Sequence, residues 1–525
     1  MRWPLMLLLL ALAVAPARPD ELPRFRRLDN GLQTCAAEDR SLPLVSVQVW
    51  YRVGLIDDPP DRPGLTRQVL AARVRSASPA LGAVWRHWTV EPDAAWFCVI
   101  VPADQLDAAL AEVRSILTGG ATPTPEPQSA PADDDWLHQA ARDGLFTGHE
   151  YARLAAGAPA APASAAELQR HAAAWFVPAN ATVFVIGHAA SDSALHRTAG
   201  ALGDLPWSAA AARPIRDDAS PRGILHATAQ SLRLCWTGRG SFGNSAAVQR
   251  VLVQALANTV DGPLAGASRQ ISGKSVALRH AFVGAIELAP VGGAEGSEKP
   301  EARLAAALES LAEQPLSETA LNRSRAQAGF AWRLSNDDFA RRCVARAAAE
   351  VIEGDILLFE LAPAASARVG AADVQNAARR LRSLLPVAPT VAATPTVLSP
   401  RWCRSPLDAR RFAPAVDLRT PSGSRARLLA TPGAPLLHVR VAGAATPASS
   451  ALDALADLTS YRGIRTEVRS TPREFSLSGP PYELAALLEL AFRLGVDPRN
   501  PAVELEIVGD ADRAAVEAAL DAAAP

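Results

Sequence analysis

Histidine and cysteine are the side chains in this sequence best suited to hold a metal ion or to act in catalysis. The chain has nine histidines and five cysteines, and both sets are widely scattered. No two histidines stand two or four residues apart, so no helix or strand carries a simple zinc-binding pair. The GxSxG nucleophile elbow and the Walker A loop are also absent. The spacing of residues in the sequence does not exclude a Ser–His–Asp triad, because the members of such triads come together only in the folded protein.

The cysteines form no CxxC or Cys/His metal pattern. An odd number cannot pair completely within one chain, and we predict buried free thiols. Cys35 and Cys98 both fall on predicted strands, and the sequence leaves open whether they are bonded. The full set is Cys35, Cys98, Cys235, Cys343 and Cys403.

One GxGxxG pattern stands at Gly238–Gly243, between an expected strand at 232–236 and an expected helix from Ser245. This is the local context of a dinucleotide-binding loop. Such loops also need an acidic residue at the end of the next parallel strand, whereas Asp261 stands in a Gly/Pro turn. We interpret the glycines as a strand-to-helix turn.

The elements around these residues follow from turn signals and apolar alternation. Asn30-Gly31 predicts a hairpin turn. Val45, Val47 and Val49 alternate with polar residues and predict a half-buried strand. A helix should follow Gly64, and residues 80–101 should form a second hairpin that turns at 91–93.

Several of these stretches resemble the M16 metallopeptidases (insulinase, pitrilysin and mitochondrial processing peptidase). They are Leu28–Leu32 (LDNGL), Trp50–Gly54 (WYRVG), Gly64–Thr66 (GLT), Phe146–Tyr151 (FTGHEY) and Phe176–Gly187 (FVPANATVFVIG). The resemblance covers nearly the whole mature chain. It implies an α+β fold of repeated domains, each a mostly antiparallel sheet packed with helices.

The same resemblance identifies the positions of the family's zinc motif, HxxEH. The two histidines would fall on Arg67 and Ala71, and the general-base glutamate on Leu70. Arginine is cationic and repels a metal ion, and leucine and alanine have no donor atom. We therefore predict that the zinc expected for the family is lost and that the chain has no cofactor. Only Glu126 and the acidic run 133–135 stand near the family's third ligand, and neither is assigned.

In the family, an exposed edge strand binds substrate peptides by backbone hydrogen bonds. The matching residues here are Trp85, Arg86, Trp88 and Thr89, although packing is the favoured role for both tryptophans. The family's second type of domain also carries an Arg and a Tyr that hold substrate. Arg269 matches the first, and Val276 replaces the second.

The domain organisation combines these patterns with composition. Apolar residues 5–15 and Ala15-Pro16-Ala17 predict a cleaved signal peptide, export to the periplasm or the extracellular space, and no stable membrane insertion afterwards. Residues 416–525 read as a truncated repeat of the first domain. The expected divisions are a signal peptide at 1–17, an M16 N-terminal-type domain at 22–213, an M16 C-terminal-type domain at 221–388, a Pro-rich linker at 389–415 and the degenerate repeat at 416–525.

These expectations favour an exported, non-catalytic protein that completes the chamber of a catalytically active M16 subunit or binds extended peptides. The net charge of −1 and the lack of a basic, aromatic-rich patch argue against nucleic-acid binding. Three alternatives remain open: an active zinc peptidase with a relocated metal site, a stand-alone peptide-binding protein and a structural envelope protein.

Overall fold

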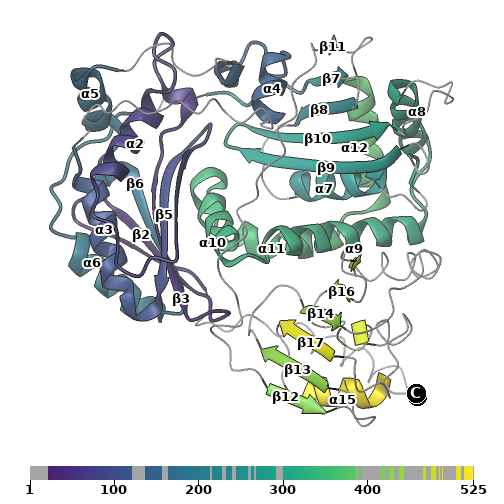
Figure 1. Ribbon diagram of the computed structural model, residues 1–525. Helices are drawn as coiled ribbons and strands as arrows, with labels where there is room; N and C mark the ends of the chain where they lie inside the picture. Colours follow the sequence, from purple (N-terminus) through teal and green to yellow (C-terminus); the bar gives the residue numbers. More distant parts are fainter. Residues whose placement is uncertain are drawn as a thin grey trace, which may run out of the picture.

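The computed structural model describes most of the first 391 residues and shorter parts of the remainder (Figure 1). The described residues are 22–120, 136–155, 163–212, 216–227, 232–238, 244–257, 262–264, 268–290, 300–385, 390–391, 416–419, 425–430, 437–442, 465–468, 474–479, 484, 487–488, 504–509 and 513–523. The signal peptide, Cys403, the acidic run 133–135 and the glycine loop 239–243 lie outside these ranges. No described helix is long and apolar enough to cross a membrane.

The first domain is built on a six-stranded sheet of order β1-β2-β6-β3-β5-β4. All neighbouring strands are antiparallel except β2 and β6. The hairpin predicted at Asn30-Gly31 joins β1 to β2, and Gly31 has the positive φ of 82° that this turn requires. The strands are β1 (Arg24–Arg27), β2 (Gln33–Glu38), β3 (Leu44–Tyr51), β4 (Trp85–Val90), β5 (Ala95–Pro102) and β6 (Ala181–Gly187).

Helices α2, α3 and α6 cover one face of this sheet (Figure 1). The core there includes Val45, Val47 and Val49 from β3, and Leu70 and Leu110 from the helices. The helical segments of this domain are η2 (Leu55–Asp57), α2 (Leu65–Ser76), η3 (Ala103–Gln105), α3 (Leu106–Thr118), α4 (Trp136–Arg142), η4 (Glu150–Ala155), α5 (Ala165–Trp175), η5 (Pro178–Asn180) and α6 (Ser191–Leu202).

The prediction of a half-buried β3 is wrong, because α10 (Phe339–Ala348) of the second domain covers the other face of the sheet. Ser46 and Gln48 are therefore fully buried. Their polar groups are satisfied along the strand: Gln48 Nε2 donates to Ser46 Oγ (3.1 Å), and Trp50 Nε1 donates to Gln48 Oε1 (2.8 Å). The alternation of apolar and polar residues along β3 correctly indicated its two faces. It did not indicate that both faces of the sheet are covered.

The second domain has a five-stranded sheet of order β11-β7-β8-β10-β9 with helices packed against it (Figure 1). The hairpin β9–β10 begins at Ser268 and ends at Pro290. The strands are β7 (Gly223–Ala227), β8 (Leu232–Gly238), β9 (Ser268–Leu278), β10 (Ala281–Pro290) and β11 (Thr390–Val391). The helices are α7 (Asn244–Ala257), α8 (Pro300–Glu313), α9 (Glu318–Ser335), α10 (Phe339–Ala348), the π-helix η6 (Ala349–Glu353), α11 (Leu357–Ala367) and α12 (Ala371–Ser383).

The third sheet repeats the first, with the order β12-β13-β17-β14-β16-β15. Each pair has the same sense as its counterpart, including the single parallel pair, β13 with β17. His438 Nε2 lies 2.8 Å from Asp337 Oδ2 and so contacts the second domain. The elements are β12 (Val416–Arg419), β13 (Arg425–Ala430), β14 (Leu437–Ala442), β15 (Arg465–Val468), β16 (Glu474–Gly479), β17 (Glu504–Gly509) and α15 (Arg513–Ala523).

The cysteines agree with the prediction of buried free thiols. Cys35, Cys98, Cys235 and Cys343 are all free and buried. Cys35 and Cys98 lie on β2 and β5, which β6 and β3 separate. Burial raises the thiol pKa of Cys35, and it raises that of Cys98 to about 12, so neither thiol is a reactive nucleophile.

Candidate functional site

Helix α2 begins at a capping arrangement built around the buried carboxylate of Asp58. Gly64 is left-handed (φ 84°) and turns the chain into the helix. Asp58 accepts hydrogen bonds from Gly64 N (2.6 Å), Thr66 N (2.8 Å) and Thr66 Oγ1 (2.6 Å). Thr66 Oγ1 also lies 2.9 Å from His171 Nε2 of α5. These bonds satisfy donors that the first turn of a helix leaves unpaired, and they fix where α2 starts.

Burial shifts the titration of this cluster. It raises the pKa of Asp58 to about 6, although the hydrogen bonds from Thr66 and Gly64 oppose the shift. It lowers the pKa of His171 to about 4, because the imidazolium form is poorly solvated there. His171 is therefore neutral at pH 7 and serves as a hydrogen-bond partner of Thr66.

The three zinc-motif positions lie on α2, and their side chains differ in exposure. Arg67 is exposed, whereas Leu70 (0% exposed) and Ala71 (1% exposed) are buried. Leu70 belongs to the core between the sheet and its helices. A cation, an isobutyl group and a methyl group do not fit Zn²⁺, which needs nitrogen, sulfur or oxygen donors. Among the described residues, no group of three or more His, Cys, Asp or Glu side chains is arranged to hold a metal ion.

His149, the histidine of the FTGHEY stretch, has a structural role. Its Nε2 lies 2.9 Å from the carbonyl oxygen of Asp217, and its Nδ1 accepts from Tyr151 N at 3.1 Å. Both ring nitrogens are thus engaged, and the ring also packs on Tyr151. His149 holds the FTGHEY segment against the chain that leads into the second domain.

Strand β4, the predicted peptide-binding edge, is the last strand of the first sheet and pairs only with β5 among the described residues. Its outer row of backbone amide and carbonyl groups therefore has no strand partner in that part of the chain. Thr89 is half-buried on this strand. The geometry is that of an edge to which an extended peptide can add by backbone hydrogen bonds.

The side chains of β4 are held firmly. Arg86 binds the buried carboxylate of Glu112, which also accepts from Ala80 N (2.9 Å). Trp88 packs on the core beneath the helices, whereas Trp85 packs on the opposite core, beneath α10. The favoured packing role of both tryptophans is confirmed. The charge of Arg86 is neutralised by that of Glu112.

Arg269 lies on β9, an edge strand of the second sheet, but its side chain is outside the described residues. Val276, which replaces the family's tyrosine, packs against a core between the first two domains. Among the contacts that the structure describes, none joins the β4 residues to Arg269.

Sequence reasoning missed a buried polar cluster between the first two domains. Asp93, 2% exposed, accepts from Tyr151 Oη (2.7 Å) and from Arg279 N (3.0 Å). Tyr151 Oη in turn accepts from His280 N (3.1 Å). Asp93 stands in the predicted Glu-Pro-Asp turn and Tyr151 ends the FTGHEY stretch. Both were visible in the sequence, but nothing in it placed them together.

Comparison with known proteins rests on structure. No protein-family model and no curated protein matches the sequence. The peptidase M16 inactive domain from Pseudomonas fluorescens matches with 16% identity and a TM-score of 0.55, over 71% of this chain and 99% of that chain. The periplasmic protease PqqL from Escherichia coli matches with 14% identity and a TM-score of 0.54, over 96% and 76%. The first half of PqqL matches with 15% identity and a TM-score of 0.51, over 69% and 90%.

These likenesses define the chain as an α+β protein of repeated sheet-and-helix domains, as the sequence predicted. More particularly, its fold is that of the M16 peptidases. One of these similar structures is described as an inactive domain and another as a periplasmic protease, and those descriptions apply to those proteins.

Proposed function

We propose that this chain is an exported, non-catalytic M16-like protein that forms the zinc-free half of a clamshell protease. The observation that carries the proposal is helix α2. It carries the positions that the family resemblance assigns to the zinc motif, but its Arg67, Leu70 and Ala71 offer no metal ligand and no general base. The family resemblance supplies the partner, a catalytically active M16 subunit.

The first two domains are joined in a way that suits a chamber wall. Arg342 of α10 pairs with Asp39 of the first domain (2.8 Å) and contacts Ser41, and all three residues are buried. The Asp93 cluster forms a second buried polar contact between the same domains. Two such contacts, together with the apolar packing beneath α10, favour one rigid unit over two domains that hinge.

Strand β4 would give this half its role in substrate handling. An extended peptide would add to the edge through backbone hydrogen bonds, with little selection by charge because Glu112 neutralises Arg86. The same edge supports a second candidate, a stand-alone peptide-binding protein that acts without a partner. An active zinc peptidase would need three converging ligands, and the described residues contain no such group.

Native mass spectrometry of the mature protein, purified gently from its own host, tests the proposal. We expect a zinc-free chain in complex with an M16 subunit that carries the metal. A lone chain with one stoichiometric Zn²⁺ would overturn the non-catalytic assignment. A lone, metal-free chain would overturn the subunit role and leave peptide binding, to be measured with extended peptides, or a structural envelope role.

A further inference from the structure

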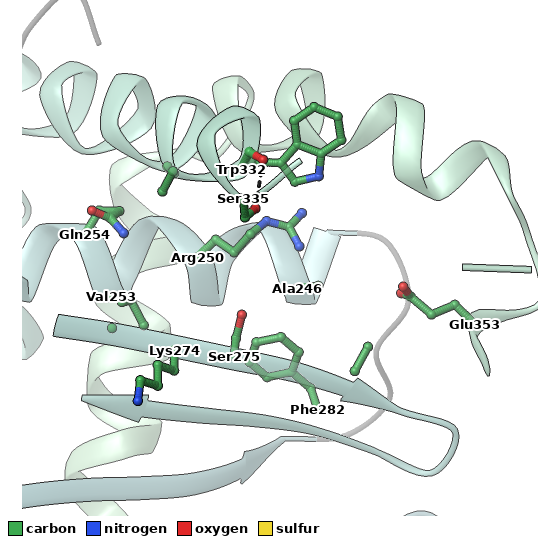
Figure 2. A pocket seen from close by; sticks show the side chains of 14 residues that line it. Ala246, Arg250, Val253, Gln254, Lys274, Ser275, Phe282, Trp332, Ser335 and Glu353 are labelled. Atoms are coloured by element: carbon green, nitrogen blue, oxygen red, sulfur yellow. Dashed lines mark hydrogen bonds between the residues drawn. The ribbon is translucent and has the colours of Figure 1, made fainter. Parts of the chain in front are cut away.

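A cavity of about 360 Å³ lies within the second domain, between α7, β9, α9 and the π-helix η6 (Figure 2). An adjoining lobe of about 300 Å³ extends beneath α10 and α11 and shares Arg250, Trp332 and Glu353 with it. Volumes of this size are typical of sites for small molecules. Neither lobe includes a residue of α2 or β4, so a ligand bound in this cavity would not depend on the proposed function.

The cavity exists because α7 lies close to β9 at one point and diverges from it at another. A side chain at Gly273 would meet Val253 Cγ1 at 1.7 Å, so glycine is needed where helix and strand touch. One turn earlier on α7, Arg250 stands opposite the small residues Ser275 and Ala277, and the space stays open. Figure 2 shows Arg250 extending into this space between Trp332 and Ser275.

Arg250 and Glu353 are two charged groups without a direct partner in the described part of the chain. The Nε of Arg250 is buried and makes no hydrogen bond there. Glu353 is near enough to raise the pKa of Arg250 electrostatically, while burial acts in the opposite direction and prevails. Burial also raises the pKa of Glu353 to about 7. Buried polar groups are normally bonded, so the Nε of Arg250 has unmet capacity for a hydrogen-bond acceptor.

Both signs of charge line the two lobes. Lys274 also borders this space, but its side chain points to the opposite side of β9 from Arg250 (Figure 2). Glu91, whose Oε1 accepts from Trp96 Nε1 (3.0 Å), adds a second carboxylate in the adjoining lobe. A simple anion would therefore face carboxylates, and a simple cation would face Arg250. A ligand that carries one charge of each sign meets both demands at once.

The adjoining lobe is mostly apolar. Ile352, Leu358, Phe359 and Ala362 line it, and Leu361, which is 55% exposed, also contributes to the lining. The ring of Trp332 packs on Phe359, with centroids 4.7 Å apart, and gives the lobe an aromatic wall. An aliphatic side chain of a ligand would be well accommodated there.

We propose that this cavity binds a small zwitterion with aliphatic side chains, namely a short apolar peptide such as a dipeptide. The carboxylate of the ligand binds Arg250, its ammonium group binds Glu353, and its side chains enter the apolar lobe. Arginine is suited to this task because its planar fork binds a carboxylate through two hydrogen bonds.

Isothermal titration calorimetry of the full mature chain with L-leucyl-L-leucine at pH 7 tests this inference. We expect saturable binding with a dissociation constant below about 1 mM. N-acetylation or C-terminal amidation of the dipeptide should each weaken binding about tenfold or more, because each removes one charge-assisted contact. These two analogues test the recognition without altering the protein.

Arg250→Met and Glu353→Gln should each weaken binding of the free dipeptide about tenfold or more. Arg250→Met should not further weaken binding of the amidated analogue. Arg368→Met, at an exposed position after α11, serves as the matched control and should bind as the unaltered chain does. The absence of heat up to about 10 mM ligand, equal affinity for all three dipeptides, or unchanged affinity in Arg250→Met would overturn the inference.

Discussion

The ion pair between Arg342 and Asp39 gives the sharpest test of how the first two domains are held together. Both side chains are at most 6% exposed, and Asp39 is also 3.4 Å from Arg346. Although burial opposes it, the nearby arginines lower the pKa of Asp39 from 3.8 to about 2. That difference corresponds to about 2 kcal/mol of stability at neutral pH.

Replacing Arg342 by Met should cost more than this value, about 3–5 kcal/mol, because Asp39 would remain buried with only part of its compensation. Arg341→Met is the matched control, since Arg341 is the adjacent residue on α10 and is exposed. Unfolding in urea, followed by tryptophan fluorescence at pH 7, measures both variants. The control should change the free energy of unfolding by less than about 0.5 kcal/mol.

The dependence on pH adds an internal check. A carboxyl group with a lowered pKa in the folded protein stabilises it above the unfolded value of 3.8, and this stabilisation is lost as the pH falls toward 2. The difference in free energy of unfolding between the unaltered chain and Arg342→Met should therefore shrink as the pH falls from about 4 to about 2. This range lies between the unfolded and folded pKa values of Asp39. A loss below about 1 kcal/mol at pH 7, or a difference that does not vary with pH, would refute this account of the contact.

Three further outcomes follow from the first domain. The triple variant Arg67→His, Leu70→Glu, Ala71→His should bind no stoichiometric Zn²⁺ by inductively coupled plasma mass spectrometry and should unfold at lower urea, because Leu70 is in the core; tight zinc binding would contradict the observed burial. His171→Gln should remove a pH-dependent change of about 3 kcal/mol in the free energy of unfolding, because burial of the imidazolium destabilises the unaltered chain as the pH falls from 6.5 to about 4; identical pH profiles would show that His171 is not responsible. Glu112→Gln should lower the free energy of unfolding by about 1–3 kcal/mol, since it removes the charge that binds Arg86; an unchanged urea midpoint would contradict this.

Local signals in the sequence were sufficient for most elements of the first domain. The Asn30-Gly31 turn, the hairpin that turns at 91–93 and the helix after Gly64 all form where expected. The repeat in the last segment was recognisable because strand spacing survives even where side chains change. The M16 fold itself followed from short stretches such as WYRVG, in which turn residues and buried aromatics stand in a fixed order.

The parts that the sequence did not reveal depend on contacts between distant residues. Ser46 and Gln48 are buried only because α10 (Phe339–Ala348) covers them. This helix follows them in the sequence by about three hundred residues. The pairing of Asp93 with Tyr151 and the cavity around Arg250 also need elements that approach only in the folded molecule. Periodicity gives the inward face of each element, but not what will cover it.

The cover that α10 provides also sets an order for biosynthesis. Cys35, Trp50, Cys98 and Phe184 form an apolar sheet face that meets its partners only at Phe339–Ile356. Until the chain has been made past that point, the first domain presents this face to its surroundings, although all its own strands are already present. A fragment that ends after α6 would therefore tend to aggregate, and chaperone protection during synthesis would be needed until α10 has been made.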